Sequence, residues 1–290
     1  MIGHSHILER LKREASEGRL HHAQLFVGPE SVGKTTAALK LAVFLQGGEE
    51  NVLVKKQILE GLDSDTILFL DRGDSLPIEE IRNVIARANE SHMKPYLVVV
   101  IENIGRMKPE AMNALLKTLE EPLPETVFLL TAHNEEDVLP TIRSRCHMTR
   151  FQTVPEQEMV AGCEGHVQTD RLLFFAMGRP GKLKRLIADA EYLAAHERLL
   201  QDVIGFAEKP GTAGVFALVR KYEDEPLLPE LLDILLARLR NWTLGGHVPQ
   251  VLRGLDLTVM IERVEDSKAG LKNNVNTKLL LENLFLTFVS

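Results

Sequence analysis

The residues with the clearest chemistry in this chain are glycines, a lysine and a threonine that occur together at 28–35. Their spacing fits G-x-x-x-x-G-K-[ST], the pattern of phosphate-binding P-loops. Gly28 and Gly33 allow a tight turn whose backbone N–H groups point inward at a phosphate chain. Lys34 adds a positive charge for the β- and γ-phosphates, and the Thr35 hydroxyl is suited to coordinate Mg²⁺.

The sequence on either side of this loop supports a nucleotide site. Residues 23–27 are an apolar stretch that predicts a short strand, and residues 36–42 are strong helix formers. The N-terminus of a helix favours anions, so strand, loop and helix occur in the required order. The alternative is a chance glycine-rich turn, which this context disfavours. We expect ATP or ADP with Mg²⁺ to contact Gly28, Ser31, Val32, Gly33, Lys34, Thr35 and Thr36.

A second polar group follows the strongest predicted strand, residues 96–101. That strand ends in Glu102 and Asn103. In P-loop ATPases an acidic residue here holds Mg²⁺, and a second one often orients the attacking water. Asn103 cannot act as a carboxylate base, so we expect little hydrolysis at this site. The alternative is that the pair is only a junction between a strand and a loop.

Residues 1–153 alternate between predicted strands and helices, which indicates an α/β domain with a mainly parallel sheet. Ligands of such sheets bind at the carboxyl ends of the strands. The P-loop and Glu102 each follow a strand, and Asn134 lies just past another, so we expect them to converge on one site. Ser75 is the expected N-cap of a helix that contains Pro77. The predicted strands are 23–27, 66–70, 96–101, 127–131 and 147–151.

The pattern changes after residue 153, where helical segments follow one another without a convincing strand. A turn at 178–181 separates two of these helices. The clearest later helix spans 227–242, with leucines along one side. We therefore expect the rest of the chain to be all-helical.

Composition describes an ordinary soluble protein of 290 residues with 44% hydrophobic residues and a net charge of −7. This charge argues against nucleic-acid binding by bulk electrostatics. The two cysteines are too few for a disulfide framework, and the histidines lack ligand spacing. The sequence contains no signal peptide and no 18-residue apolar run, so we expect a cytoplasmic protein without membrane contact.

Several further motifs accompany the P-loop. The most specific are Leu-Leu-Lys-Thr-Leu-Glu-Glu-Pro at 115–122 and Ser-Arg-Cys at 144–146. With them the chain resembles, nearly end to end, the delta-prime subunits of bacterial clamp loaders, which are AAA+ proteins of the polymerase III holoenzyme. The other matching stretches are Ile2-Gly3-His4, His22-Ala23, residues 25–29, 112–114 and 139–143, Asn274-Val275-Asn276 and residues 281–284.

The resemblance implies an α/β AAA+ P-loop domain at 1–153, a small helical lid domain at 154–200 and an all-α collar domain at 201–290. The collar would join a five-subunit ring with gamma/tau motor and delta subunits, and the ring would load a sliding clamp onto primed DNA. In such rings the arginine of Ser-Arg-Cys reaches a neighbour's ATP site, a role that falls on Arg145. The alternative for Arg145 is a structural salt bridge at the edge of the sheet.

Departures from the family's pattern bear on activity. Glu102–Asn103 replaces an Asp-rich pair, and glycine within 178–181 replaces the lid arginine of motor subunits. Many relatives carry a four-cysteine zinc module after the P-loop helix, but residues 46–65 contain no cysteine, so we expect no zinc site. The Asn134 position matches the family's nucleotide sensor. We therefore expect a stator with little catalysis of its own; the alternatives are an active gamma/tau-like motor and an unrelated P-loop enzyme such as a small-molecule kinase.

Overall fold

The computed structural model divides into two compact units, which we describe separately. The first comprises Met1–Val167 with Gly178–Lys182, and the second comprises Gln168–Met177 with Leu183–Ser290. The division into three domains at 153 and 200 stays a prediction. Ser75, Pro77, Pro122 and Asn274 lie outside the residues that the structure describes, which are 1–71, 78–88, 94–121, 125–271 and 275–289.

The first unit is built on a five-stranded sheet with the order β2-β3-β4-β1-β5. Every strand pair in it is parallel. This confirms the predicted α/β architecture. The strands are β1 (Ala23–Val27), β2 (Thr66–Phe69), β3 (Leu97–Ile101), β4 (Thr126–Ala132) and β5 (His147–Arg150).

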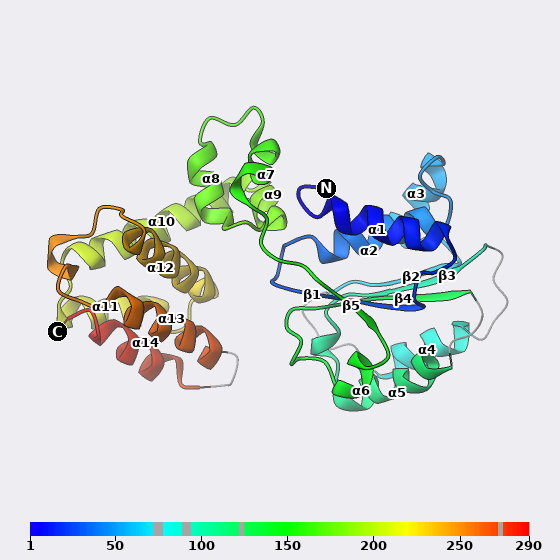
Figure 1. Cartoon of the computed structure of the whole chain (residues 1–290). Helices are drawn as coiled ribbons and strands as arrows, with labels where there is room; N and C mark the ends of the chain where they lie inside the picture. Colours follow the sequence, from blue (N-terminus) through cyan, green and yellow to red (C-terminus); the bar gives the residue numbers. More distant parts are fainter. Residues whose placement is uncertain (72–77, 89–93, 122–124, 272–274, 290) are drawn as a thin grey trace. The chain divides into compact units, whose positions relative to one another are not determined.

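Helices cover both faces of this sheet (Figure 1). The helices on one face are α1 (Ser5–Ser16), α2 (Lys34–Leu45) and α3 (Val52–Leu59). Those on the other are α4 (Ile78–Ala88), α5 (Pro109–Glu120) and α6 (Pro140–Arg143). A 3₁₀ turn, η1 (Ile104–Arg106), follows β3, and α7 (Glu156–Val160) and η2 (Ala161–Cys163) follow β5.

The two faces of the sheet form separate cores because side chains alternate along a strand. On β1, Leu25 packs with α4, α5 and α6, whereas Phe26 packs with α1 and α2. Every residue of β1, β3 and β4 is buried. Burial on both faces explains why these strands read as continuous apolar runs.

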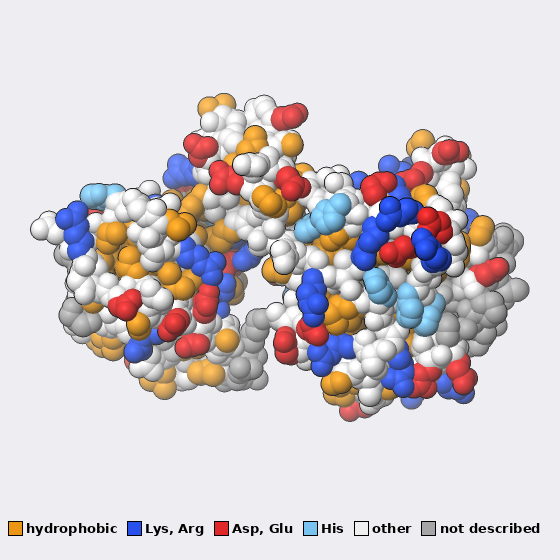
Figure 2. Space-filling model, in the orientation of Figure 1, with side chains coloured by type: hydrophobic (Ala, Val, Ile, Leu, Met, Phe, Trp, Pro, Cys, Tyr) orange, Lys and Arg blue, Asp and Glu red, His pale blue; other side chains and the backbone are white. Residues whose placement is uncertain are grey.

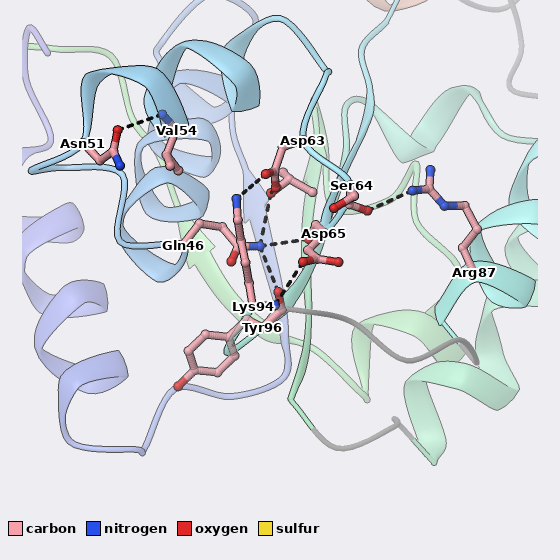
Figure 3. Close-up of polar contacts among 10 residues, drawn as sticks. Gln46, Asn51, Val54, Asp63, Ser64, Asp65, Arg87, Lys94 and Tyr96 are labelled. Atoms are coloured by element: carbon pink, nitrogen blue, oxygen red, sulfur yellow. Dashed lines mark hydrogen bonds and ion pairs between the residues drawn. The ribbon is translucent and has the colours of Figure 1, made fainter.

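A network of hydrogen bonds and an ion pair holds the start of β2, an edge strand of the sheet, in place (Figure 3). The Gln46 side chain at the end of α2 donates to the Asp65 carbonyl oxygen at 2.9 Å and to Thr66 Oγ1 at 3.2 Å. Thr66 Oγ1 donates to Asp63 Oδ2 at 2.7 Å, and the Lys94 ammonium pairs with the Asp63 carboxylate. These hydrogen bonds hold β2 against α2 and the segment before β3, and Gln46 takes part in them only through its amide nitrogen.

The second unit is helical throughout its described residues. Helix α12 is its most buried element, with Leu231, Leu232 and Leu239 fully enclosed. No helix within the described ranges is long and apolar enough to cross a membrane. The helices are α8 (Thr169–Ala176), the part of α9 (Pro180–Ala188) from Leu183, α10 (Ala190–Glu208), α11 (Thr212–Tyr222), α12 (Leu228–Thr243), η3 (Gln250–Leu252), α13 (Leu257–Leu271) and α14 (Thr277–Leu286).

Candidate nucleotide-binding site

The P-loop joins β1 to α2, and its two glycines are required for different reasons. Gly28 has φ 154°, and a Cβ there would lie 2.0 Å from the Phe151 carbonyl oxygen, so no side chain fits. Gly33 is the N-cap of α2 with φ 108°, a conformation that side chains rarely adopt, although no atom crowds it. The loop therefore needs glycine at the first position for space and at the second for backbone conformation.

The middle of the loop is fixed from two sides. Val32 is fully buried, which anchors the loop in the core beneath α1 and α2. The Ser31 carbonyl oxygen accepts a hydrogen bond of 2.8 Å from the Gly181 N–H. A Cβ at Gly181 would lie 3.1 Å from the Ser31 Cβ, so a larger residue would crowd the loop. Gly181, one of the two glycines in the turn predicted at 178–181, thus lies directly against the P-loop.

Lys34 is the first residue of α2 and is only 5% exposed. Its ammonium group donates to the carbonyl oxygens of Gly28 at 2.7 Å and Pro29 at 2.6 Å. Burial lowers the pKa of Lys34 to about 8, and the negative charges of Glu30 and Glu102 only partly oppose this shift. Phosphate oxygens would offer the ammonium stronger acceptors than these carbonyls.

Thr35 and Glu102 lie together although 67 residues separate them in the chain. The Thr35 hydroxyl donates a hydrogen bond of 2.5 Å to Glu102 Oε1, and Glu102 Oε2 accepts one of 3.0 Å from the Asp71 N–H. A hydroxyl beside a carboxylate is the oxygen set that Mg²⁺ prefers, so these residues fit the expected metal. Thr36 follows in the first turn of α2 with a half-buried side chain.

Asn103 has a structural partner that the sequence analysis missed. Its amide nitrogen donates to Asp71 Oδ2 at 2.7 Å, and its backbone N–H donates to Thr131 Oγ1 at 2.9 Å. Asp71 also lies 3.3 Å from the Arg106 guanidinium. The available signal was position, because Asp71 is the first acidic residue after the apolar run that forms β2.

Two residues past the end of β4, His133 and Asn134, lie in different surroundings. The Asn134 amide donates to Asp137 Oδ2 at 2.8 Å, which ties its side chain to its own loop. The neighbouring His133 is the first residue past β4. Burial, followed by the positive charge of Lys34, lowers the pKa of His133. His133 therefore lies within electrostatic reach of the P-loop lysine, and Asn134 as a nucleotide sensor stays a prediction.

Arg145 lies apart from these residues. It precedes β5, which runs parallel to β1 with His147 opposite Gln24. Arg145 is therefore at the amino edge of the sheet, whereas the P-loop is at the carboxyl edge. Its guanidinium donates to the Thr141 carbonyl oxygen at 2.7 Å and pairs with Glu120 at the end of α5.

Among the described residues, no group of three or more His, Cys, Asp or Glu side chains is placed to hold a metal ion. Residues 46–65, where the resemblance would place a zinc module, contain α3 and no cysteine. Asn51 caps this helix through hydrogen bonds to the N–H groups of Leu53 and Val54. The predicted absence of zinc from the protein remains a prediction.

Comparison with known proteins identifies the family to which the chain belongs. A family model described as DNA polymerase III, delta subunit matches residues 3–155. The DNA polymerase III subunit gamma of Buchnera aphidicola (subsp. Acyrthosiphon pisum) is 34% identical over 55% of this chain and 46% of its own length. The gamma/tau subunit of Mycobacterium tuberculosis is 31% identical over 56% of this chain and 29% of its own. The chain thus spans less than half the length of these relatives.

Two further comparisons extend along nearly the whole chain. The replication factor C small subunit of Methanothermobacter thermautotrophicus is 25% identical over 95% of this chain and 82% of its own length. The crystal structure of a DNA polymerase III gamma subunit-related protein from Thermotoga maritima has a TM-score of 0.50 at 20% identity, covering 97% of this chain and 98% of that one. This likeness supports the AAA+ fold followed by helical segments. Because the family model matches more than half of the residues, the chain belongs to the DNA polymerase III delta subunit family.

Proposed function

We propose that this chain is a delta-prime-like stator of a bacterial clamp loader. It joins gamma/tau motor and delta subunits in a five-subunit ring that loads a sliding clamp onto primed DNA. The family match and the relatives named as polymerase III and replication factor C subunits support this assignment. Residues 201–290 are proposed to form the collar through which the ring assembles.

The observation that carries the proposal is the separation of Arg145 from its own P-loop, at opposite edges of one parallel sheet. A guanidinium at that edge is better placed to contact the nucleotide of a neighbouring subunit than the nucleotide of its own subunit. The planar guanidinium can donate several hydrogen bonds to the negative charge that develops on the transferred phosphoryl oxygens. A lysine ammonium at the same position would not be an equivalent substitute. The Arg145 side chain is 32% exposed and so remains within reach of a partner.

In this proposal the chain's own site binds nucleotide and hydrolyses it slowly or not at all. Lys34 binds the phosphates, while Thr35 and Glu102 hold Mg²⁺, which would neutralise phosphate charge. The position of the second acidic residue is filled by Asn103, an amide engaged with Asp71. Without a carboxylate at position 103, Asn103 cannot take a proton from the attacking water.

The decisive experiment reconstitutes the loader with Arg145→Ala. We expect the variant to fold, assemble and bind nucleotide normally, while ATP hydrolysis by the ring falls and clamp loading fails. Arginine fingers supplied by a neighbour are worth about 10³–10⁵ in rate at the affected site. The matched control is Arg150→Ala, which removes an exposed arginine of β5 that pairs with Glu135. Normal hydrolysis and loading by the Arg145→Ala ring would refute the role in trans.

The second candidate is an active gamma/tau-like motor. It is favoured by the names of the relatives with 31–34% identity and by the Asp71 carboxylate beside Asn103. ATP turnover of about 1 s⁻¹ or more by the isolated protein would support it over the stator. Loss of that turnover in Lys34→Ala would assign it to this P-loop.

A further inference from the structure

A second basic site lies on the first unit, away from the P-loop. It is a hollow with a volume of ≈ 360 Å³. Figure 2 shows Lys, Arg and His side chains gathered on this face of the molecule. The lining residues come from α1, the segment before β1 and the first position of β5, and they are Arg10, Arg13, Glu14, Arg19, His21 and His147.

The fold separates this hollow from the nucleotide site. Arg19 and His21 precede β1, whereas the P-loop follows it. A strand rises about 3.3 Å per residue, so the five residues of β1 hold the two sites roughly 13 Å apart or more. Neither Lys34 nor Arg145 belongs to the lining. The hollow is therefore part of neither the P-loop nor the proposed arginine finger.

The charge of the hollow is opposite to that of the chain. Three arginines line it against the carboxylate of Glu14, and one of them, Arg19, also pairs with Glu17, in a protein whose net charge is −7. A local cluster of guanidinium groups attracts anions even where the net charge repels them, because neighbouring charges dominate within a Debye length of about 10 Å.

Some of these side chains are held in place and others have unused donors. Arg10 donates to Thr149 Oγ1 at 2.9 Å and lies 3.9 Å from Glu14, which fixes its guanidinium against β5. His147 uses Nδ1 for a 3.2 Å contact with Gln24 Oε1, and within the described part of the chain its Nε2 has no partner. Arg13 is exposed, and its guanidinium makes no hydrogen bond or ion pair with any described residue. A guanidinium with all its donors available suits an incoming oxyanion.

We propose that this hollow is a phosphate-binding site. Guanidinium forks match phosphate oxygens in a bidentate manner, and here arginines from two segments converge on one cavity. The volume lies within the usual 300–1,000 Å³ range of ligand pockets, which leaves room for the sugar or ester attached to a phosphate. The phosphate belongs either to a nucleic-acid backbone or to a small phosphorylated molecule.

The test measures binding to the full-length protein carrying Lys34→Ala, which removes the P-loop lysine. The probes are inorganic phosphate, followed by NMR of arginine and histidine side chains, and fluorescent single-stranded oligothymidine, followed by anisotropy. Arg13→Glu should weaken binding of the recognised probe at least about tenfold, since a hydrogen bond to a charged group is lost and its charge reversed. Arg82→Glu is the matched control, because Arg82 is exposed on α4 and makes no ion pair with a described residue.

Each outcome has a defined meaning. Oligonucleotide binding that depends on Arg13 and weakens with salt identifies a nucleic-acid backbone as the source. Arg13-dependent binding of inorganic phosphate without oligonucleotide binding identifies a small phosphorylated molecule. The proposal is overturned if neither probe binds, if Arg13→Glu and Arg82→Glu behave alike, or if polyglutamate binds through Arg13 more tightly than either probe. None of these results depends on the clamp-loader assignment.

Discussion

The Asn103 side chain donates a 2.7 Å hydrogen bond to the carboxylate of Asp71, joining the ends of β3 and β2. Asp71 in turn donates its backbone N–H to Glu102 Oε2 at 3.0 Å. The side-chain amide of Asn103 therefore acts as a hydrogen-bond donor within the structure, and the Asp71 carboxylate is its acceptor. This relationship ties the geometry of the proposed Mg²⁺ carboxylate to Asn103, which stands where the resemblance predicts an acidic residue.

We predict that Asn103→Asp destabilises the protein. The change removes a donor and places two carboxylates in contact, which should lower the free energy of unfolding by about 1–3 kcal/mol in urea titrations. The double variant Asp71→Asn/Asn103→Asp exchanges donor and acceptor and should recover much of that loss. An Asn103→Asp protein as stable as the original would contradict the pairing.

Thr35→Val should abolish the contribution of Mg²⁺ to ATP binding. Valine keeps the shape of threonine but removes the hydroxyl that faces Glu102. We expect ATP affinity in Mg²⁺ to fall about tenfold or more, and affinity in EDTA to change little, as measured by calorimetry. Thr35→Ser retains the hydroxyl and should bind normally. An equal loss with and without Mg²⁺ would point to a packing defect.

Lys34 should make stability depend on pH. Its pKa falls from 10.5 to about 8 on folding because the ammonium is buried, so the unfolded chain binds more protons between these values. The free energy of unfolding therefore rises with pH across pH 8–10.5, by roughly 3 kcal/mol from this group. Measured against Lys34→Met, wild type should gain this amount over that window. A constant difference between the two proteins would disprove the shift.

Glu120→Gln tests the structural alternative for Arg145. The two side chains are paired but both are partly exposed, at 32% for Arg145 and 46% for Glu120. Exposed ion pairs contribute about 0–1 kcal/mol, so thermal unfolding should shift by no more than a few degrees. Ring ATPase activity should persist because Arg145 remains. A large loss of stability would favour a salt-bridge role for Arg145.

Asp63→Ala should be more damaging than Glu120→Gln. The Asp63 side chain is 5% exposed, pairs with the Lys94 ammonium and accepts from Thr66 Oγ1 at 2.7 Å. Removing it leaves two donors without an acceptor, which should cost about 1–3 kcal/mol in chemical denaturation. Asp63→Asn keeps an acceptor for Thr66 and should cost less. Equal stability of wild type and Asp63→Ala would show that the network contributes nothing net.

The sequence alone determined the features that depend on short stretches of chain. The P-loop pattern and the apolar runs are local, so they predicted the loop between β1 and α2 and the buried strands of the parallel sheet. Strand ends differ from prediction by at most one residue, as for the strand predicted at 127–131 and found at Thr126–Ala132. End positions depend on pairing with neighbouring strands, which a local pattern does not contain.

Only the tertiary structure decided which side chains meet. Asp71 reaches Asn103 from 32 residues away, and Arg10 reaches Thr149 from 139 residues away. The turn after β4 directs Asn134 to Asp137 and leaves His133 near Lys34. Such contacts follow from strand order and from the face on which each side chain lies. The parallel sheet sets both by bringing distant segments to the same edge. The position of Asp71 after a strand could be read from the sequence, but its hydrogen bond to Asn103 and the basic hollow could not.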